Sequence, residues 1–229
     1  MLIIGHRGAC GYEPENTLQS FARAIELGAD MIELDVQVRR TGELVVIHDD
    51  TVDRTTNGHG RVTELSLEEL RKLDAGQGER IPTLTEVFDL VDRRVPINVE
   101  LKSPGVAEPV AKLISTYRTR GWDSDRFIVS SFDHPELARF HGLQSDISIG
   151  ALIGHLPIDL AKYAAELGAW SANCNREFLN SNFVADAHER GLKVFVFTVN
   201  DPRDIKNMAA LGVDGIFTNF PDRARQALS

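Results

Sequence analysis

The 229-residue sequence predicts a single α/β domain folded as a (β/α)8 TIM barrel. Short apolar runs rich in β-branched residues alternate with amphipathic stretches along the whole chain, a pattern typical of a parallel sheet covered by helices. Nine segments have strand character, and one of them pairs in a hairpin outside the parallel set, which leaves eight. A chain of this length is close to the roughly 250 residues usual for such barrels.

The predicted strands are short and their order is regular. They are Leu2–Ile4, Met31–Val38, Leu44–Ile47, Ile97–Leu101, Phe127–Ser131, Ile147–Leu152, Ala169–Asn173, Lys193–Val199 and Gly215–Thr218. Amphipathic helices are predicted between them. We expect Asn16 to cap the helix Thr17–Leu27 and Gly28 to end it, and we expect Asp201–Leu211 to end at Gly212.

The segments Met31–Val38 and Leu44–Ile47 are predicted to form an antiparallel hairpin. Only five residues separate them, whereas a parallel crossover needs about a dozen or more. A tight turn at Thr41-Gly42 would place His48 opposite Asp35. The alternative fold is a doubly wound open sheet, but the glycine-rich dinucleotide fingerprint expected of such a fold is absent.

A small insertion is predicted at about residues 51–80, after the hairpin of the second barrel strand. Residues 51–60 are rich in turn formers, and Ser66–Leu73 has the pattern of a short helix, with Ser66 as its cap and Glu69 at the capping-box position. We expect this insertion to lie over the face of the barrel that carries the site. Because repeats, low-complexity tracts and linkers are absent, one domain is predicted over residues 1–229.

Composition and charge narrow the classes of partner. With 25 basic and 34 acidic residues the net charge is −9, which disfavours nucleic acid and stable association with anionic membranes. No run approaches the ~18 apolar residues of a membrane span. The two cysteines are too few for a disulfide framework, and the N-terminal residues lack the pattern of a secretion signal. We therefore expect a cytoplasmic enzyme, and the sequence leaves open whether it is a homo-oligomer.

Acidic side chains gather at predicted strand ends, which form the functional face of such barrels. Glu33 and Asp35 are two residues apart on one strand, so both carboxylates face the same side, and Glu100 and Lys102 are spaced in the same way. Carboxylates sharing a buried face repel unless a cation lies between them. Three such groups suit Mg²⁺, Ca²⁺ or Mn²⁺. The alternative is that these charges face solvent or pair with Arg7 and Lys102.

Two histidines and two cations complete the candidate site. His6 and His48 each follow a predicted strand, and an imidazole can accept or donate a proton near pH 7. Either one alone is more often structural, but two beside a predicted metal site favour general acid–base catalysis. Arg7 and Lys102 supply fixed positive charge for an anion, a role compatible with neutralising the carboxylates.

Short motifs follow one another in order along nearly the whole chain. They are His6-Arg7-Gly8, Glu13-Pro14-Glu15-Asn16-Thr17, Glu33-Leu34-Asp35-Val36, His48-Asp49, Asp53-Arg54-Thr55-Thr56, Leu73-Asp74-Ala75-Gly76, Ile81-Pro82-Thr83-Leu84, Val99-Glu100-Leu101-Lys102, Ser130-Ser131-Phe132, Thr198-Val199-Asn200 and Leu211–Asn219 with Pro221 and Asp222. Each motif alone is weak, but the ordered set is specific. It resembles the glycerophosphodiester phosphodiesterase family.

The resemblance implies a (β/α)8 barrel with an insertion at about residues 51–80, and a metal-dependent reaction. The expected reaction is hydrolysis of glycerophosphodiesters, such as glycerophosphocholine or glycerophosphoethanolamine, to sn-glycerol 3-phosphate and an alcohol. A divalent metal, Mg²⁺ or Ca²⁺ with Mn²⁺ as a further candidate, is the implied cofactor. Two other functions remain open: a lysophospholipase-D-like phosphodiesterase and a non-catalytic phosphodiester-binding protein.

The resemblance also assigns roles to individual residues. The implied metal ligands are Glu33, Asp35 and Glu100. The implied base and acid are His6 and His48, in an order that the sequence leaves open. The implied substrate-binding residues are Arg7 and Lys102 for the phosphate, with Glu15 and Asn16 organising His6, Arg7 or the glycerol end. Phe197 stands where many relatives carry Trp, so an apolar wall is kept but the indole N–H donor is lost.

Overall fold

Eight parallel strands close into a barrel in the computed structural model, which describes residues 1–229. They are β1 (Leu2–Gly5), β2 (Met31–Val38), β4 (Ile97–Leu101), β5 (Phe127–Ser131), β6 (Ser148–Ile153), β7 (Ser171–Asn175), β8 (Lys193–Phe197) and β9 (Gly215–Thr218). Strand β1 pairs in parallel with both β2 and β9, which closes the sheet. The predicted (β/α)8 TIM barrel is therefore confirmed.

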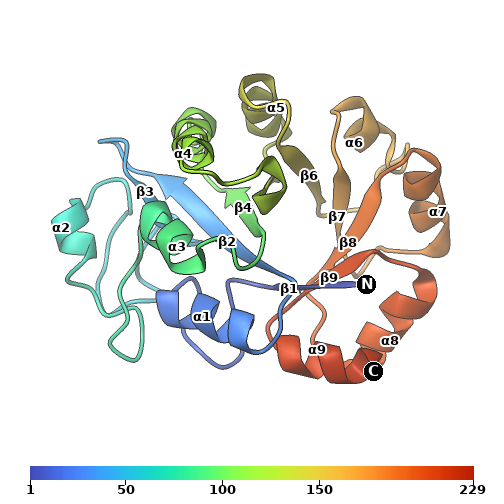
Figure 1. The fold of residues 1–229 in the computed structure, drawn as a ribbon, viewed down its shortest axis with the longest axis horizontal. Helices are drawn as coiled ribbons and strands as arrows, with labels where there is room; N and C mark the ends of the chain where they lie inside the picture. Colours follow the sequence, from blue (N-terminus) through green and yellow to red (C-terminus); the bar gives the residue numbers. More distant parts are fainter.

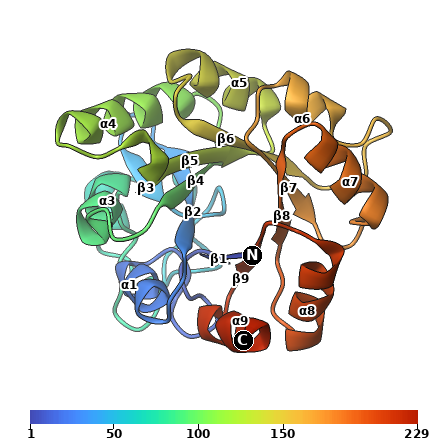
Figure 2. The same cartoon turned by 45° about the vertical axis from the view of Figure 1, so that its right-hand side comes forward.

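Helices surround the barrel in chain order (Figures 1 and 2). They are α1 (Leu18–Glu26), α3 (Leu84–Val91), α4 (Ala107–Thr119), α5 (His134–Leu143), α6 (Lys162–Glu166), α7 (Ser181–Glu189), α8 (Pro202–Leu211) and α9 (Pro221–Leu228), with a short 3₁₀ turn at Ser124–Arg126. Both termini lie near β1 and α9, where the closed barrel brings the chain ends together. No helix combines the length and apolar character needed to cross a bilayer.

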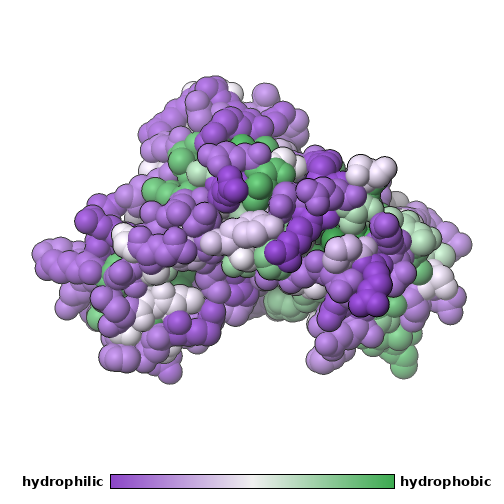
Figure 3. Space-filling view, turned by 90° about the horizontal axis from the view of Figure 1, so that it is seen from below, coloured by the Kyte–Doolittle hydropathy of each residue, from purple (hydrophilic) through white to green (hydrophobic).

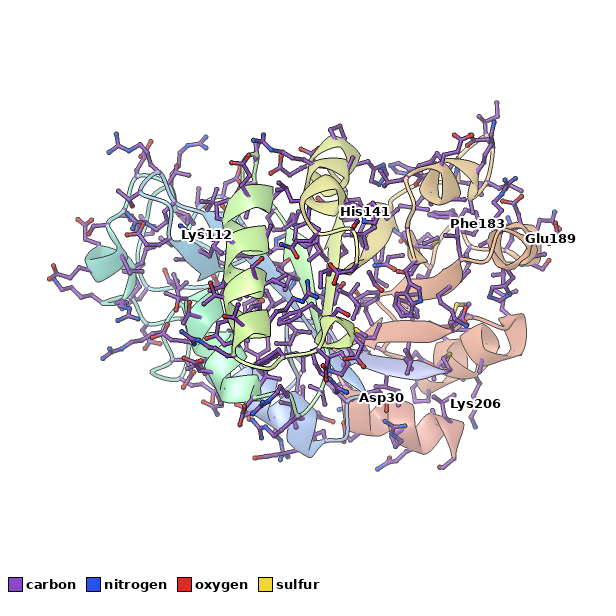
Figure 4. All side chains as sticks on the ribbon, turned by 45° about the horizontal axis from the view of Figure 1, so that its top comes forward. Asp30, Lys112, His141, Phe183, Glu189 and Lys206 are labelled. Atoms are coloured by element: carbon purple, nitrogen blue, oxygen red, sulfur yellow. The ribbon has the colours of Figure 1, made fainter.

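Most of the apolar core lies between the strands and the helical ring. On the N-terminal side it includes Phe88, Trp122 and Phe127, with the last two rings stacked at 5.3 Å. Figure 4 shows Lys112 on α4 and Lys206 on α8 on the outer side of the ring, where both are exposed. A smaller apolar cluster, including Ile4, Ile128, Phe195 and Phe217, lies inside the barrel. The interior of the barrel is thus filled by side chains.

The surface is polar over most of its area. Figure 3 shows one face of the molecule, largely hydrophilic with smaller hydrophobic areas between. This distribution agrees with a chain in which 26% of the residues are charged. The exposed large apolar side chains include Phe132, Leu156 and Ile158, which follow β5 and β6.

The hairpin forms, but its predicted register is wrong by one residue. Strand β3 (Leu44–Val46) pairs antiparallel with β2 so that Val36 lies opposite Val46, and the Ile47 N–H donates to the Asp35 carbonyl. Ile47, and not His48, is therefore the neighbour of Asp35. The turn has three residues rather than two because Gly42 takes a φ of +95°, a left-handed conformation suited to glycine in three-residue hairpins.

The start of α1 also differs from expectation. Thr17 caps the helix, its side chain accepting from the Ser20 N–H, whereas Asn16 has a φ of +59° and turns its side chain toward Asp35. Asparagine tolerates this left-handed backbone better than most residues. Asn16, the expected cap, therefore binds Asp35 inside the barrel, and Thr17 caps the helix.

The segment between β3 and α3 contains one short helix, α2 (Leu67–Leu70), with the predicted Ser66–Glu69 capping box. Its apolar side chains, including Val52, Val62 and Leu70, form a small separate core with residues of the hairpin. This anchoring holds the segment against β3 at the edge of the barrel (Figure 1).

Candidate active site

Three carboxylates from two adjacent strands meet inside the barrel. Strands β2 and β4 pair so that Asp35 lies beside Glu100, and Glu33 lies one inward-facing position earlier on β2. One oxygen atom from each group lies within 4.8 Å of the others. All three residues are buried, with at most 9% exposed. The structure thus brings together the carboxylates that the sequence proposes as metal ligands.

Arg7 and Asn16, which lie between β1 and α1, contact the two carboxylates of β2. The Arg7 backbone N–H donates to Glu33 Oε2 at 2.8 Å. The Asn16 amide donates to Asp35 Oδ2 at 2.9 Å, and Arg7 Nε lies 3.1 Å from the same oxygen. The outer oxygens are different: Glu33 Oε1 and Asp35 Oδ1 are buried and have no hydrogen-bond partner.

Lys102 balances part of the remaining negative charge. Its ammonium lies 2.7 Å from Glu100 Oε1 and 3.7 Å from Asp35 Oδ1. Burial, together with the neighbouring Asp35 charge, raises the pKa of Glu100 to about 7. Burial and the charges of Asp35 and Glu100 also raise the pKa of Glu33 well above its usual range. When all three carboxylates are ionised, their three negative charges exceed the two positive charges of Arg7 and Lys102, and the raised pKa values reflect this excess together with burial.

This donor set fits a hard divalent cation. Oxygen ligands from several carboxylates are what Mg²⁺ and Ca²⁺ prefer. Buried oxygens without a donor are costly in a folded protein, and a cation bound between them would satisfy both Glu33 Oε1 and Asp35 Oδ1. The same cation would offset the repulsion among the three carboxylates.

Each candidate histidine is oriented through its Nδ1 atom. His6 Nδ1 lies 2.8 Å from Asn219 Oδ1, and His48 Nδ1 lies 2.5 Å from Asp49 Oδ1. Because both partners are acceptors, each Nδ1 carries the proton and Nε2 is left for other groups. Burial, reinforced by the Arg7 charge, lowers the pKa of His6 to about 4.

The site opens into a pocket of about 210 Å³. His6, Arg7, His48 and Lys102 line one side of it together with Glu33 and Glu100. Phe132, Leu152, Phe197 and Phe217 supply an apolar wall, and the rings of Phe132 and Phe197 meet edge to face at 5.8 Å. The pocket thus offers charge for a phosphate and an apolar surface for the rest of a ligand.

The remaining substrate-binding candidates divide into two groups. Phe197 lines the pocket directly. Glu15 and Asn16 are not lining residues: Glu15 contacts Arg7 at 2.7 Å, and Asn16 contacts Asp35. Glu15 therefore positions Arg7, and Asn16 positions Asp35.

A family model described as the glycerophosphoryl diester phosphodiesterase family matches residues 6–223, almost the whole chain. The chain belongs to this family, and it is a phosphodiesterase.

Relatives and solved structures agree with this assignment. A glycerophosphodiester phosphodiesterase of Caldanaerobacter subterraneus subsp. tengcongensis is 42% identical over 96% of this chain and 95% of the relative. One of Bacillus altitudinis is 40% identical over 97% and 96%. A solved Oleispira antarctica phosphodiesterase, in complex with the product sn-glycerol-3-phosphate, superposes with a TM-score of 0.92 at 30% identity, over all of this chain and 96% of that one.

Several residues around the site of this phosphodiesterase were given no role from the sequence, although Arg54 and Phe132 lie in two of the motifs. Asn98 lies two residues before Glu100, so the alternation of side chains along a strand could have placed it in the pocket. Phe132 directly follows β5, a strand-end position that could have drawn attention to it. Arg54 bridges Glu15 and Asp49 from the segment after β3, and no strand or helix pattern in the sequence indicates this.

Proposed function

We propose that this phosphodiesterase hydrolyses glycerophosphodiesters, such as glycerophosphocholine, to sn-glycerol 3-phosphate and an alcohol with the help of a divalent metal. The observation that carries the proposal is the buried carboxylate triad, in which Glu33 Oε1 and Asp35 Oδ1 have no hydrogen-bond partner. Two histidines and two basic side chains, Arg7 and Lys102, line the same pocket. The named product in the Oleispira antarctica complex supports the same reaction.

In this proposal Glu33, Asp35 and Glu100 hold the metal, which is Mg²⁺ or Ca²⁺ with Mn²⁺ as a further candidate. The metal would neutralise phosphate oxygens and stabilise the charge that develops on them. Arg7 and Lys102 would bind the phosphate from the protein side, because both line the pocket with fixed positive charge.

The surroundings of the two histidines suggest different tasks. His6 is buried beside Arg7 and stays neutral near pH 7, so its Nε2 can accept a proton from the attacking hydroxyl. His48 Nδ1 contacts the Asp49 carboxylate, which orients the ring, and we assign His48 as the group that protonates the leaving alkoxide. The attacking hydroxyl belongs either to water or to the adjacent glycerol carbon. A cyclic phosphate among early products would identify glycerol attack.

The decisive measurement is release of sn-glycerol 3-phosphate from glycerophosphocholine after chelation and again with Mg²⁺, Ca²⁺ or Mn²⁺ restored. We expect product only in the restored samples. Glu33→Gln should abolish the restoration, whereas Glu136→Gln is a matched control, because Glu136 is also a buried carboxylate but contacts the Ala107 N–H outside the pocket. No product with any metal would contradict the proposed reaction.

A parallel assay with lysophosphatidylcholine tests the lysophospholipase-D-like alternative. We expect the deacylated diester to be turned over faster than the lysolipid. A preference for the lysolipid would assign the alternative activity. Tight binding of the diester without product would instead indicate a phosphodiester-binding protein.

A further inference from the structure

Arg54 joins two carboxylates by paired contacts on both sides of its guanidinium. Its Nη1 and Nη2 atoms lie 2.8 and 2.9 Å from Glu15 Oε2 and Oε1. Its Nε and Nη2 atoms lie 2.6 and 3.1 Å from Asp49 Oδ2 and Oδ1. The planar guanidinium matches two carboxylates in this fork geometry, and a lysine ammonium cannot reproduce it.

Each of these carboxylates also contacts one residue of the pocket. Glu15 Oε1 lies 2.7 Å from Arg7 Nη1, and Asp49 Oδ1 lies 2.5 Å from His48 Nδ1. Arg7 and His48 line the pocket, whereas Glu15, Asp49 and Arg54 do not. A continuous chain of charged contacts therefore links a phosphate-binding candidate to a proton-transfer candidate, with Arg54 at its centre.

The two pocket residues at the ends of this chain come from different parts of the fold. Arg7 follows β1, and His48 follows β3, the hairpin strand at the end of the sheet. The backbone hydrogen bonds of the barrel fix β1 and β2, but they do not set the direction of either side chain. Arg54 belongs to the segment after β3, so that segment reaches both side chains through one group.

We propose that Arg54 is a positioning residue that fixes the side chains of Arg7 and His48 relative to each other across the pocket. This inference rests on the proposed function, because it assigns phosphate binding to Arg7 and proton donation to His48. Arg54 does not touch substrate; it acts through Glu15 on one side and Asp49 on the other.

The pattern of exposure indicates that the role of Arg54 is geometric more than stabilising. Its side chain is 48% exposed, and ion pairs at such positions contribute little to stability. Glu15 and Asp49 are more covered, at 21% and 29%. Losing Arg54 would leave Arg7 as the side-chain partner of Glu15 and His48 as that of Asp49, with nothing holding either carboxylate from the outer side. Misplacement of a catalytic group by about 1 Å can reduce the rate on the order of 100-fold.

The first test compares Arg54→Ala with Arg71→Ala in the full-length, metal-loaded protein. Arg71 is a matched control in the same segment: it is 45% exposed and pairs with Glu86 at 2.6 Å, away from the pocket. We expect Arg54→Ala to reduce kcat/KM by about 10- to 100-fold and Arg71→Ala to leave it within about twofold of the wild type. Equal melting temperatures of the two variants would show that the loss is not caused by unfolding.

Arg54→Lys separates charge from geometry, and it serves as a second variant if Arg54→Ala folds poorly. The ammonium keeps the positive charge but can contact one carboxylate closely at a time. We expect kcat/KM near that of Arg54→Ala. Wild-type activity in Arg54→Lys, or activity of Arg54→Ala within twofold of the wild type, would overturn the proposal.

A change of leaving group tests whether both sides of the bridge matter. Hydrolysis of the 4-nitrophenyl diester of glycerol 3-phosphate keeps the glycerol hydroxyl, releases a stable phenolate and needs little help from an acid, whereas glycerophosphocholine releases choline and needs it. We expect Arg54→Ala to lose more activity on glycerophosphocholine than on the nitrophenyl diester, and still to lose some on the latter through Arg7. Equal losses on both substrates would show that Arg54 does not act through His48. A loss on glycerophosphocholine alone would show that it does not act through Arg7.

These outcomes are separable from failure of the proposed function. If the wild-type protein, with any metal, released no glycerol 3-phosphate, the assigned reaction would be wrong whatever Arg54 does. If the wild-type protein is active and Arg54→Ala matches Arg71→Ala, the reaction stands and only the role of Arg54 is refuted.

Discussion

The two halves of the barrel contribute different kinds of side chain to one pocket. Every charged or titratable lining residue comes from the chain up to Lys102: His6, Arg7, Glu33, His48, Glu100 and Lys102. From residue 130 onward the lining is Phe132, Leu152, Phe197, Thr198 and Phe217. In the proposed function, β1–β4 would carry the reaction at phosphorus, and β5–β9 would shape the space for the organic part of the substrate.

The two halves also differ in whether their buried side chains have favourable partners. In the charged half, buried oxygens of Glu33 and Asp35 lack hydrogen-bond partners, and burial together with the Asp35 charge raises the pKa of Glu100 to about 7. The apolar wall shows no such conflict, because Phe132 and Phe197 pack edge to face and Phe132 is 49% exposed. Buried carboxylate oxygens without donors and raised carboxyl pKa values therefore occur in the part of the pocket where a cation would bind.

The largest predicted effect tests the charged half through its histidines. His6→Ala and His48→Ala should each reduce kcat for glycerophosphocholine by about 10²–10⁴, the usual contribution of general acid–base catalysis. The control is His188→Ala, since His188 also pairs with an aspartate, Asp214, but lies on α7 away from the pocket. Melting temperatures should stay close to that of the wild type. Near-normal turnover in either site variant would show that the residue has no role in proton transfer.

The next prediction concerns the stability of the metal-free protein. The folded pKa of Glu100, about 7, lies above the ordinary 4.5 of the unfolded chain, so between these values the folded state binds more protons. Stability should therefore be highest below about pH 4.5 on this account and fall as pH rises to about 7, by roughly 1–3 kcal/mol. The raised pKa of Glu33 acts in the same direction.

Thermal unfolding between pH 5 and 8, with chelator and with Mg²⁺, measures this change. The lowered pKa of His6, about 4, makes a contribution of opposite sign below about pH 6.5, so the effect of Glu100 is measured as the difference between the wild type and Glu100→Gln. Without metal, the wild type should lose stability relative to Glu100→Gln as pH rises, and bound metal should remove that relative loss, because ionised carboxylates are then compensated. A metal-free wild type that gains stability relative to Glu100→Gln over this range would contradict the raised pKa of Glu100.

The sequence predicted the charged half far better than the apolar half, for a physical reason. Charged residues placed two apart on an apolar strand are conspicuous, as with Glu33 and Asp35, and their burial follows from strand alternation. Phe132 and Phe217 are ordinary core residues by type, and only the closed barrel shows that they face the pocket. The same limit applies to Arg54, whose partners Glu15 and Asp49 are brought to it by folding.

Local backbone choices were predictable to within about a residue. The capping box at Ser66 and the glycine after α8 follow from side-chain chemistry and formed as expected. The hairpin register and the cap of α1 did not. Gly42 permits a three-residue turn as readily as a two-residue one, and Asn16 can either cap a helix or bind Asp35. In both cases tertiary contacts decide between local alternatives of similar energy.

A moderate effect is expected when the apolar wall is opened. Phe132→Ala removes a ring that packs on Phe197 and lies 6.0 Å from Lys102 Nζ. KM for glycerophosphocholine should rise several-fold, about 3- to 10-fold, because apolar contact with the substrate is lost. The kcat value should change less than about threefold, since no reacting group moves. Stability should change little at a side chain already half exposed. A loss confined to kcat would contradict the division between the halves.

The smallest effect, and the sharpest probe of the comparison, is expected for Phe197→Trp. Phe197 lines the pocket and meets the rings of Phe132 and Phe217 at 5.8 and 6.4 Å, so an indole can extend into the open space with its N–H available as a donor. We expect the ratio of kcat/KM for glycerophosphocholine to that for glycerophosphoethanolamine to change by about threefold, with the metal dependence and the effect of His48→Ala unaltered. Such a shift would assign the apolar half to choosing the alcohol. If Phe197→Trp instead lowered kcat on both substrates by 100-fold or more, the wall would be part of the catalytic arrangement, because only a change at the reacting atoms reduces turnover independently of the alcohol.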